Sequence, residues 1–265
     1  MSFPRITVVT VVFNAEKIIK KTIQSVLSQN YPNLEYIVVD GKSQDRTIEI
    51  IKQYVKIDKV ISEPDRGIYD AMNKGLLMAT GEWVLFMNAG DLFCNPNVLR
   101  DLELGHVKKA VSVVYGDSIY VYGKDHFYFP AKDKNMLRDS GMPFCHQAVL
   151  VRRTVLAAHP FDLSYKLLAD YNLFRTLLLE NFMFEYKTIP VCIYNVDGGL
   201  TDSSQWLCRR EMNRILHRDD SIVSRCFFFL KSFTRRFLRP CNQLLRRYKY
   251  KKNLIRDDQI SHFIY

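Results

Sequence analysis

The sequence predicts an α/β fold built on a mixed, mainly parallel sheet that is flanked by helices. β-branched runs of strand length alternate with segments whose apolar residues recur every three or four positions. Strands that alternate with helices in this way favour parallel pairing with right-handed crossovers. With 265 residues, of which 48% are hydrophobic, the chain is long enough to bury a core without disulfides.

The first half of the chain carries the regular part of this pattern. The expected strands are Ile6–Val12, Leu34–Val39, Val60–Ile61 and Trp83–Met87. The expected helices have apolar faces formed by Ile19, Ile23, Val26 and Leu27, by Ile48, Ile51 and Val55, and by Ile68, Met72, Leu76 and Ala79. In the less regular second half we expect strands at Val111–Tyr115, Ser118–Tyr122 and Val149–Val151, a helix at Ala169–Asn181 and an extended segment at Met183–Val191.

Polar residues follow the four apolar strands of the first half. These residues are Asn14, Asp40, Asp65 and Asp91. Because ligands of open α/β sheets bind beyond the carboxyl ends of the strands, we expect a ligand site at this edge. The sequence has neither GxGxxG after its first strand nor GxxxxGK[ST], which argues against dinucleotide oxidoreductases and P-loop enzymes.

The cysteines and the first residues favour a cytoplasmic protein. Six cysteines are scattered without a CxxC pair, a pattern typical of reduced thiols. The start of the chain lacks the basic region and cleavage site of a signal peptide. No uncharged apolar run approaches the roughly 20 residues that span a bilayer.

The net charge of +10 comes from the C-terminal part of the chain. Residues 1–204 hold 23 basic and 23 acidic side chains, whereas residues 205–256 hold 15 basic and 3 acidic ones. We therefore expect a folded domain at 1–204 and a basic helical tail at 205–265.

From Ser221 onward the tail has the pattern of an amphipathic helix. Its apolar positions are Ile222, Cys226, Phe229, Phe233 and Phe237, and basic residues occupy the other faces. Such a helix suits the headgroup layer of an anionic membrane. Two alternatives are a helix packed on the folded domain with a solvated basic face, and a nucleic-acid contact, although we expect no nucleic-acid partner.

Three motifs resemble the family 2 glycosyltransferases, which have the GT-A fold. They are ITVVTVVFN at 6–14, VDGKSQD at 39–45 and SEPDRGIYDAMNKG at 62–75. The resemblance is closest to the bacterial colanic-acid and exopolysaccharide branch. It extends to about residue 201 through CHQA at 145–148, ADY at 169–171 and GGLT at 198–201.

This resemblance implies transfer of a sugar, with inversion, from a nucleotide-diphosphate sugar to an acceptor hydroxyl. The residues that it places around the nucleotide and donor sugar are Thr10, Val12, Asn14, Asp40, Asp65, Arg66 and Asn88. Asp40 would bind the base or ribose, or alternatively stabilise the loop at Gly41. Asp65 and Arg66 would lie near the diphosphate and donor sugar, or alternatively form a turn with solvated charges.

The fourth strand departs from the family pattern at the metal site. Asn88-Ala89-Gly90 stands where the family carries Asp-x-Asp, and Asp91 is the next carboxylate. An Asn oxygen is a neutral and weaker ligand for a hard cation. The resemblance implies Mg²⁺ or Mn²⁺ with Asp91 as a ligand, and the replacement leaves the metal dependence open.

Asp170 matches the position of the family's general base. Inversion needs one carboxylate to take the proton of the acceptor hydroxyl. The alternative is a helix N-terminal Asp that interacts with the helix dipole. His146 and Gln147 are expected to contact donor or acceptor, and the alternative for His146 is a hydrogen-bonded core residue.

The sequence therefore predicts an inverting glycosyltransferase of surface-polysaccharide biosynthesis. We expect a glycan or polyprenyl-linked acceptor and peripheral association with the inner face of the plasma membrane. Two other classes remain open. One is a catalytically degenerate nucleotide-sugar-binding subunit, and the other is a membrane- or nucleic-acid-binding adaptor.

Overall fold

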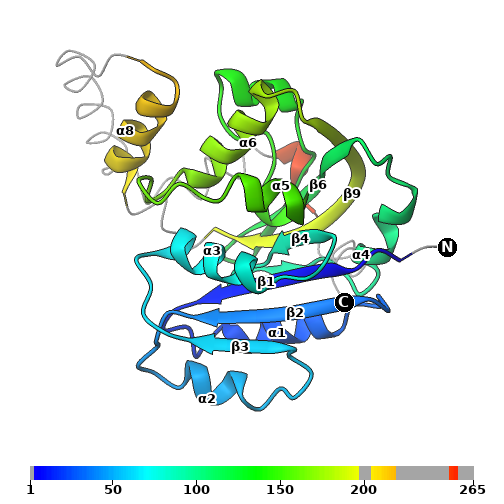
Figure 1. Ribbon diagram of the computed structural model, residues 1–265, viewed down its shortest axis with the longest axis vertical. Coiled ribbons are helices and arrows are strands. Elements are labelled where there is room, and N and C mark those ends of the chain that lie inside the picture. Colours follow the sequence, from blue (N-terminus) through cyan, green and yellow to red (C-terminus); the bar gives the residue numbers. More distant parts are fainter. Residues whose placement is uncertain (1–2, 197–203, 219–250, 256–265) are drawn as a thin grey trace.

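The computed structural model describes residues 3–196, 204–218 and 251–255 (Figure 1). Its strands are β1 (Ile6–Val12), β2 (Leu34–Asp40), β3 (Lys59–Ser62), β4 (Trp83–Phe86), β5 (Leu92–Phe93), β6 (Val111–Tyr122), β7 (Asp125–Phe129), β8 (Val149–Arg152) and β9 (Met183–Asn195). Its α-helices are α1 (Ile19–Leu27), α2 (Thr47–Ile51), α3 (Ile68–Met78), α4 (Val98–Asp101), α5 (Arg153–Ala158), α6 (Ala169–Leu179) and α8 (Gln205–Ile215). Short 3-10 helices are η1 (Leu104–His106), η2 (Lys134–Arg138), η3 (His146–Ala148) and η5 (Lys251–Asn253).

The strands form one mixed sheet in the order β3-β2-β1-β4-β8-β6-β9-β5, with β7 paired to β6. The first four strands of this order are parallel neighbours. β8 then pairs antiparallel with both β4 and β6. The predicted α/β fold with a mixed sheet is therefore confirmed. Its parallel part consists of β3, β2, β1 and β4, the strands of the first half of the chain.

Helices cover both faces of the sheet (Figure 1). Ile6 and Val8 of β1 belong to the core cluster that includes α1, and Val9 and Val11 belong to the cluster that includes α3. All seven residues of β1 are buried as a result. A central strand covered on both faces needs a continuous apolar run, which is what the sequence has.

The prediction of two separate strands at 111–122 was wrong. These residues form the single strand β6. Its parallel pairing with β9 shifts register around Asp117, where the ladder is irregular. A β-bulge bends a strand without ending it, so the turn-like Gly116-Asp117 pair lies inside the strand.

The prediction that Val55 lies on a buried helix face was also wrong. α2 ends at Ile51, and Val55 is 94% exposed. The N–H of Tyr54 donates to the carbonyl of Ile51 at 3.0 Å, and that of Gln53 donates to Ile50 at 3.2 Å. These three-residue hydrogen bonds tighten the chain into turns and end the α-helix.

α8 packs on the folded domain. Ile215 is 2% exposed and belongs to the same core cluster as residues of α3 and α6. The expected domain boundary at residue 204 therefore precedes a helix that contributes to the core. The amphipathic pattern expected at 221–239 and the motif at 198–201 lie outside the described residues.

Residues 251–255 also contact the folded domain. Leu254 forms a β-bridge with Phe127 of β7, and the N–H of Ile255 donates to the carbonyl of His126 at 2.9 Å. Ile255 is buried in the core cluster that includes α1. Within the described ranges, no helix is both long and apolar enough to cross a membrane.

We predict that Ile215→Ala lowers the free energy of unfolding by about 2–4 kcal/mol, because it leaves a cavity in the core. Val55→Ala is the matched control and should change it by about 0.5 kcal/mol or less, since Val55 is exposed. Urea unfolding of the two variants measures both values. Equal effects would contradict the packing of α8 described above.

Candidate functional site

The first group of predicted residues lies where β1 and β2 end. Val12 pairs with Asp40, and Asp40 pairs with Ser62. Asn14 follows with a left-handed φ of 47°, and its N–H donates to the Ser43 hydroxyl at 2.8 Å. Parallel strands thus bring Val12, Asn14 and Asp40 to one edge of the sheet, as expected.

The carboxylate of Asp40 is fully buried and already has hydrogen-bond donors. Oδ2 accepts from the Ser62 hydroxyl at 2.6 Å and from the Ser43 N–H at 3.1 Å, and the Ser43 hydroxyl donates to Oδ1. These contacts hold the loop that begins at Gly41. They correspond to the loop-stabilising alternative for Asp40, and contact with a base or ribose stays a prediction.

Thr10 lies beneath this edge, in the core. Its hydroxyl donates to the carbonyl of Met87 at 2.8 Å and lies 3.0 Å from the hydroxyl of Tyr36. Thr10 therefore links β1 by hydrogen bonds to β2 on one side and to the residue after β4 on the other. The carbonyl of Val12 accepts from the N–H of Gly41 at 2.9 Å and extends the same framework.

Asp65 joins the first group through Gly41. A Cβ at position 41 would come within 2.3 Å of the Asp65 Oδ2, so only glycine allows this approach. The ring of Phe13 also lies next to Gly41 and is 59% exposed.

Arg66 makes no such contact with this group in the described part of the chain. It pairs with Asp70 at 2.9 Å and keeps 76% of its side chain exposed. This hydrogen bond lowers the pKa of Asp70.

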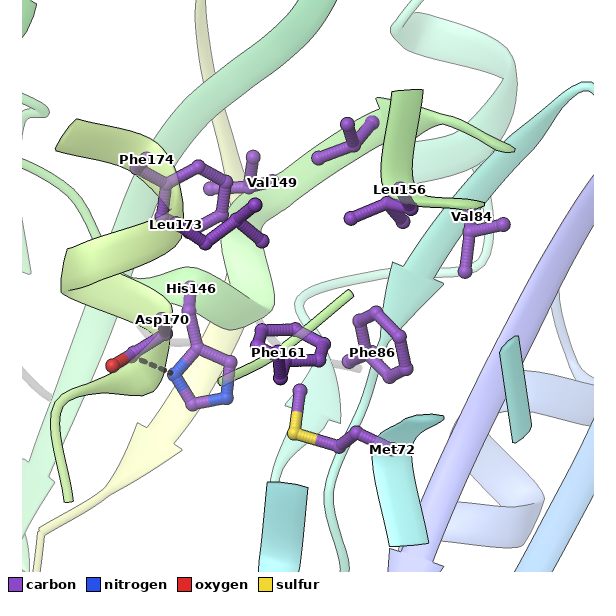
Figure 2. Close-up of a pocket in the computed structure, with 11 residues that line it drawn as sticks. Met72, Val84, Phe86, His146, Val149, Leu156, Phe161, Asp170, Leu173 and Phe174 are labelled. Atoms are coloured by element: carbon purple, nitrogen blue, oxygen red, sulfur yellow. Dashed lines mark ion pairs between the residues drawn. The ribbon is translucent and has the colours of Figure 1, made fainter. Parts of the chain in front are cut away.

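The second group links Asn88 after β4, His146 in η3 and Asp170 in the first turn of α6. The Asn88 amide donates to His146 Nε2 at 3.1 Å, and His146 Nδ1 lies 3.4 Å from Asp170 Oδ2. With Nε2 as the acceptor, the neutral ring carries its proton on Nδ1, the nitrogen that lies nearer to the Asp170 carboxylate (Figure 2). Burial lowers the pKa of His146 against the opposing charge of Asp170, which favours the neutral ring.

Two donors orient the other oxygen of Asp170. Oδ1 accepts from the Tyr69 hydroxyl at 2.9 Å and from the Tyr171 N–H at 2.8 Å. Burial, followed by the charge of Asp170, raises the pKa of Tyr69, which keeps the phenol protonated. Oδ1 thereby holds the side chain in place, and Oδ2 is the oxygen left for a substrate proton.

Apolar side chains lie beside His146 and Asp170 (Figure 2). Met72, Phe86 and Phe161 line a cavity of about 10 Å³ together with these two residues (Figure 2). The cavity has room for roughly one water molecule. These apolar side chains lower the local dielectric constant, which strengthens the electrostatic attraction between the His146 ring and the Asp170 carboxylate.

Asp91 and Gln147 form a third, buried group. The Gln147 amide donates to Asp91 Oδ2 at 2.6 Å, and the N–H of Asn195 donates to Oδ1 at 3.3 Å. The Cys145 thiol donates to Gln147 Oε1 at 2.7 Å. Burial raises the pKa of Asp91 to about 7 against both hydrogen bonds. The pairing of Asp91 with Gln147 was not predicted from the sequence.

The residues after β4 fit an oxygen-bound cation in part. Asn88 Oδ1 is buried and has no hydrogen-bond partner in the described part of the chain. Such an atom suits a hard cation or a donor hydroxyl. Asp91 supplies a carboxylate three residues later. No three His, Cys, Asp or Glu side chains form a metal-binding group within the described residues, and Asn88 is not of these types.

Two polar residues of α3 that support the site were not predicted from the sequence. Tyr69 holds Asp170, and the Asn73 amide both donates to the carbonyl of Phe161 and accepts from its N–H, at 2.9 Å each. The two residues are four positions apart and therefore share one face of the helix. Polar side chains at this spacing on an otherwise apolar face are the signal that would have indicated them.

The arrangement suits removal of a proton from a hydroxyl group. It offers an oriented carboxylate with one oxygen toward a neutral imidazole, at the edge of the sheet where ligands bind.

Comparisons with known proteins point to one family. Residues 7–159, more than half of the chain, match the family described as Glycosyl transferase family 2. A PGL/p-HBAD biosynthesis glycosyltransferase of Mycobacterium bovis is 29% identical over 212 residues, which cover 77% of this chain and 81% of that protein. The putative teichuronic acid biosynthesis glycosyltransferase TuaG of Bacillus subtilis is 38% identical over 104 residues, which cover 38% and 41%.

Solved structures share the fold. The mannosyltransferase PcManGT from Pyrobaculum calidifontis, in complex with GDP-Man and Mn²⁺, has a TM-score of 0.63 at 19% identity, covering 80% of this chain and 63% of that chain. S. aureus TarS 1-349 in complex with UDP has a TM-score of 0.58 at 18% identity, covering 80% and 69%. The chain therefore belongs to glycosyl transferase family 2 and is a glycosyltransferase with the predicted GT-A fold.

Proposed function

We propose that this glycosyltransferase moves a sugar, with inversion at the anomeric carbon, from a nucleotide-diphosphate sugar to a hydroxyl of a glycan acceptor. The observation that carries the proposal is the Asp170 carboxylate. Tyr69 and the N–H of Tyr171 hold one of its oxygens, and His146 faces the other.

In this proposal Asp170 is the general base. Its Oδ2 takes the proton of the acceptor hydroxyl while the hydroxyl oxygen bonds to the anomeric carbon. Attack comes from the face opposite the diphosphate. The bond between the anomeric carbon and the diphosphate oxygen breaks, and its electron pair leaves with the nucleoside diphosphate. His146 Nδ1, 3.4 Å from Oδ2, stabilises the charge of the carboxylate.

We assign the nucleotide to the loops after β1, β2 and β3. The exposed ring of Phe13 offers a stacking face for a base beside Asp65. Asn14 and the loop that Asp40 stabilises form the neighbouring surface. The solved structure of PcManGT contains GDP-Man, and that of TarS 1-349 contains UDP. Both ligands support a nucleotide-diphosphate sugar as the donor of this chain.

Mg²⁺ or Mn²⁺ would neutralise the charge that develops on the leaving diphosphate. Asn88 Oδ1 and Asp91 would hold it, because one is an unpaired buried oxygen and the other is a carboxylate three residues along the chain. Asp91 must be ionised to bind a cation, and its raised pKa means that the cation competes with a proton. The Mn²⁺ in the PcManGT complex supports a divalent cation.

A second candidate is a catalytically degenerate subunit that binds nucleotide sugars. The contacts of Asp91 favour it, because Gln147 and the N–H of Asn195 engage both carboxylate oxygens. The absence of Asp-x-Asp after β4 points the same way. Single-turnover transfer by the purified protein would exclude this candidate.

We further propose a lipid-linked acceptor in surface-polysaccharide biosynthesis, used at the inner face of the plasma membrane by a cytoplasmic, peripherally bound enzyme. The names of the similar proteins, which refer to PGL/p-HBAD and teichuronic acid biosynthesis, support the polysaccharide or glycolipid context. The basic excess of residues 205–256 supports an anionic surface as a partner.

We predict that Asp170→Asn lowers the transfer rate about 10²–10⁴-fold, because the amide cannot take the acceptor proton. Donor affinity should stay within about threefold, since the isosteric side chain keeps the fold. Transfer assays and calorimetric titration with donor measure the two quantities. Asp101→Asn, at an exposed position of α4, is the control. Full activity of Asp170→Asn would reject Asp170 as the base.

We predict that a panel of UDP-, GDP- and dTDP-sugars contains one preferred donor. Its turnover should fall at least about tenfold in chelator and recover with Mg²⁺ or Mn²⁺, because the leaving diphosphate needs a cation. Turnover that persists in chelator would reject the metal proposal. Absence of binding to every donor would reject the proposed donor class.

We predict that the full chain sediments with vesicles that contain phosphatidylglycerol and stays in solution with pure phosphatidylcholine. The combined change Arg235→Glu and Arg236→Glu should weaken binding about tenfold or more, since each basic residue contributes roughly 1 kcal/mol. Lys17→Glu with Lys20→Glu, two exposed residues at the start of the chain, is the charge-matched control. Equal loss in both variants would contradict a membrane role for the tail.

A further inference from the structure

One carboxylate of α8 reaches the segment that leads into α6. Glu211 is 5% exposed. Its Oε1 accepts from the N–H of Lys166 at 2.6 Å, and its Oε2 accepts from the N–H groups of Leu167 at 3.0 Å and Leu168 at 2.9 Å. Figure 1 shows α8 at the margin of the molecule, beyond α6.

One of these three N–H groups, that of the N-cap residue Leu168, belongs to the start of α6, and the other two lie in the bend just before it. The first N–H groups of a helix have no carbonyl of their own helix to bind. Leu168, the residue before α6, has no side-chain hydrogen bond that would cap the helix. A carboxylate that accepts from three successive N–H groups makes charge-assisted hydrogen bonds, which are stronger than neutral ones. Glu211 thus holds, from another helix, the N-cap residue of α6 and the two residues before it.

The segment that Glu211 holds, residues 166–168, ends two residues before Asp170. The Tyr69 hydroxyl oxygen lies 2.8 Å from the Leu167 carbonyl oxygen and 2.9 Å from Asp170 Oδ1, and its one proton is shared between these two acceptors. Tyr69 therefore contacts both the side chain of Asp170 and the backbone that Glu211 holds from the other side. A shift of this backbone would move Asp170 relative to Tyr69 and His146.

α8 contacts the same segment at a second point. Arg214 Nη2 donates to the Ser164 hydroxyl at 3.0 Å, and its guanidinium lies 4.5 Å from the centre of the Tyr165 ring. Arg214 and Ser164 are exposed and Tyr165 is buried, and neither contact involves the backbone at 166–168. They allow docking of the helix to be separated experimentally from the action of the Glu211 carboxylate.

We propose that Glu211 is a positioning residue for the general base Asp170, acting through the backbone N–H groups of Lys166, Leu167 and Leu168. The inference rests on the proposed function, since it requires Asp170 to act as the base. It assigns part of the segment C-terminal to residue 204 to the catalytic machinery. Glu211 itself touches no substrate in this proposal.

The test compares Glu211→Ala, Glu211→Gln and the control Arg214→Ala in the full chain. We expect kcat for transfer to fall about tenfold to a hundredfold in Glu211→Ala, because small displacements of a reacting group cost rates of this order. Donor affinity should stay within about threefold, since the nucleotide loops lie on other elements. Glu211→Gln should have a kcat between those of Glu211→Ala and the wild type, because its amide oxygen still accepts hydrogen bonds. The control Arg214→Ala should change kcat by less than about threefold, because Arg214 contacts Ser164 and Tyr165 and not the backbone at 166–168.

A double-variant comparison separates positioning from general damage to the fold. In the Asp170→Asn background, Glu211→Ala should lower the residual transfer rate by less than about twofold, because the group that it positions is gone. A further tenfold loss in that background, or an unchanged kcat in Glu211→Ala alone, would overturn the inference. If Glu211→Ala does not fold, unchanged kcat in Glu211→Gln overturns it.

The outcomes also distinguish this inference from the proposed function. Full activity of Asp170→Asn would reject the proposed base itself, and the positioning role with it. Loss of activity in Asp170→Asn with wild-type kcat in both Glu211 variants would reject only the role of Glu211.

Discussion

Parallel pairing of β1 with β2 on one side and β4 on the other determines where the candidate site lies. The three strands end at the same edge, so Asn14, Asp40 and Asn88 all follow strands that end there, although they are far apart in the sequence. The buried hydroxyl of Thr10 reinforces this pairing through its contacts with Tyr36 and the carbonyl of Met87. Because β1 is covered on both faces, the edge is a rigid base for the more irregular loops above it.

The carboxylate of Asp170, the proposed base, comes from the other half of the chain, and its orientation depends on contacts from several separate elements. A position in the first turn of a helix favours a negative charge but does not by itself orient the side chain. Tyr69 from α3 and His146 from η3 contact the Asp170 carboxylate directly, and Glu211 from α8 contacts the backbone before it. Each of these groups is held by packing of its own element.

Hydrogen bonding is distributed unevenly among the buried polar groups of the site. Asp40 and Asp91 have donors on both carboxylate oxygens, which suits residues that hold loops and strands together. Asn88 Oδ1 is buried without a partner in the described part of the chain. Since a buried oxygen without a donor is costly, this atom is the one whose environment improves most when a ligand binds.

The sequence by itself determined the alternation of strands and helices, the polar residues at the strand ends and the family, because apolar periodicity and short motifs are local properties. Tertiary structure alone decided that 111–122 is one bulged strand, that Val55 is exposed, and that Asp91 pairs with Gln147. It also decided that Glu211, in a segment whose sequence suggested a separate tail, accepts hydrogen bonds from the backbone that leads into α6. These features arise from hydrogen bonds and packing between residues that are distant in the sequence, and no local pattern specifies such partners.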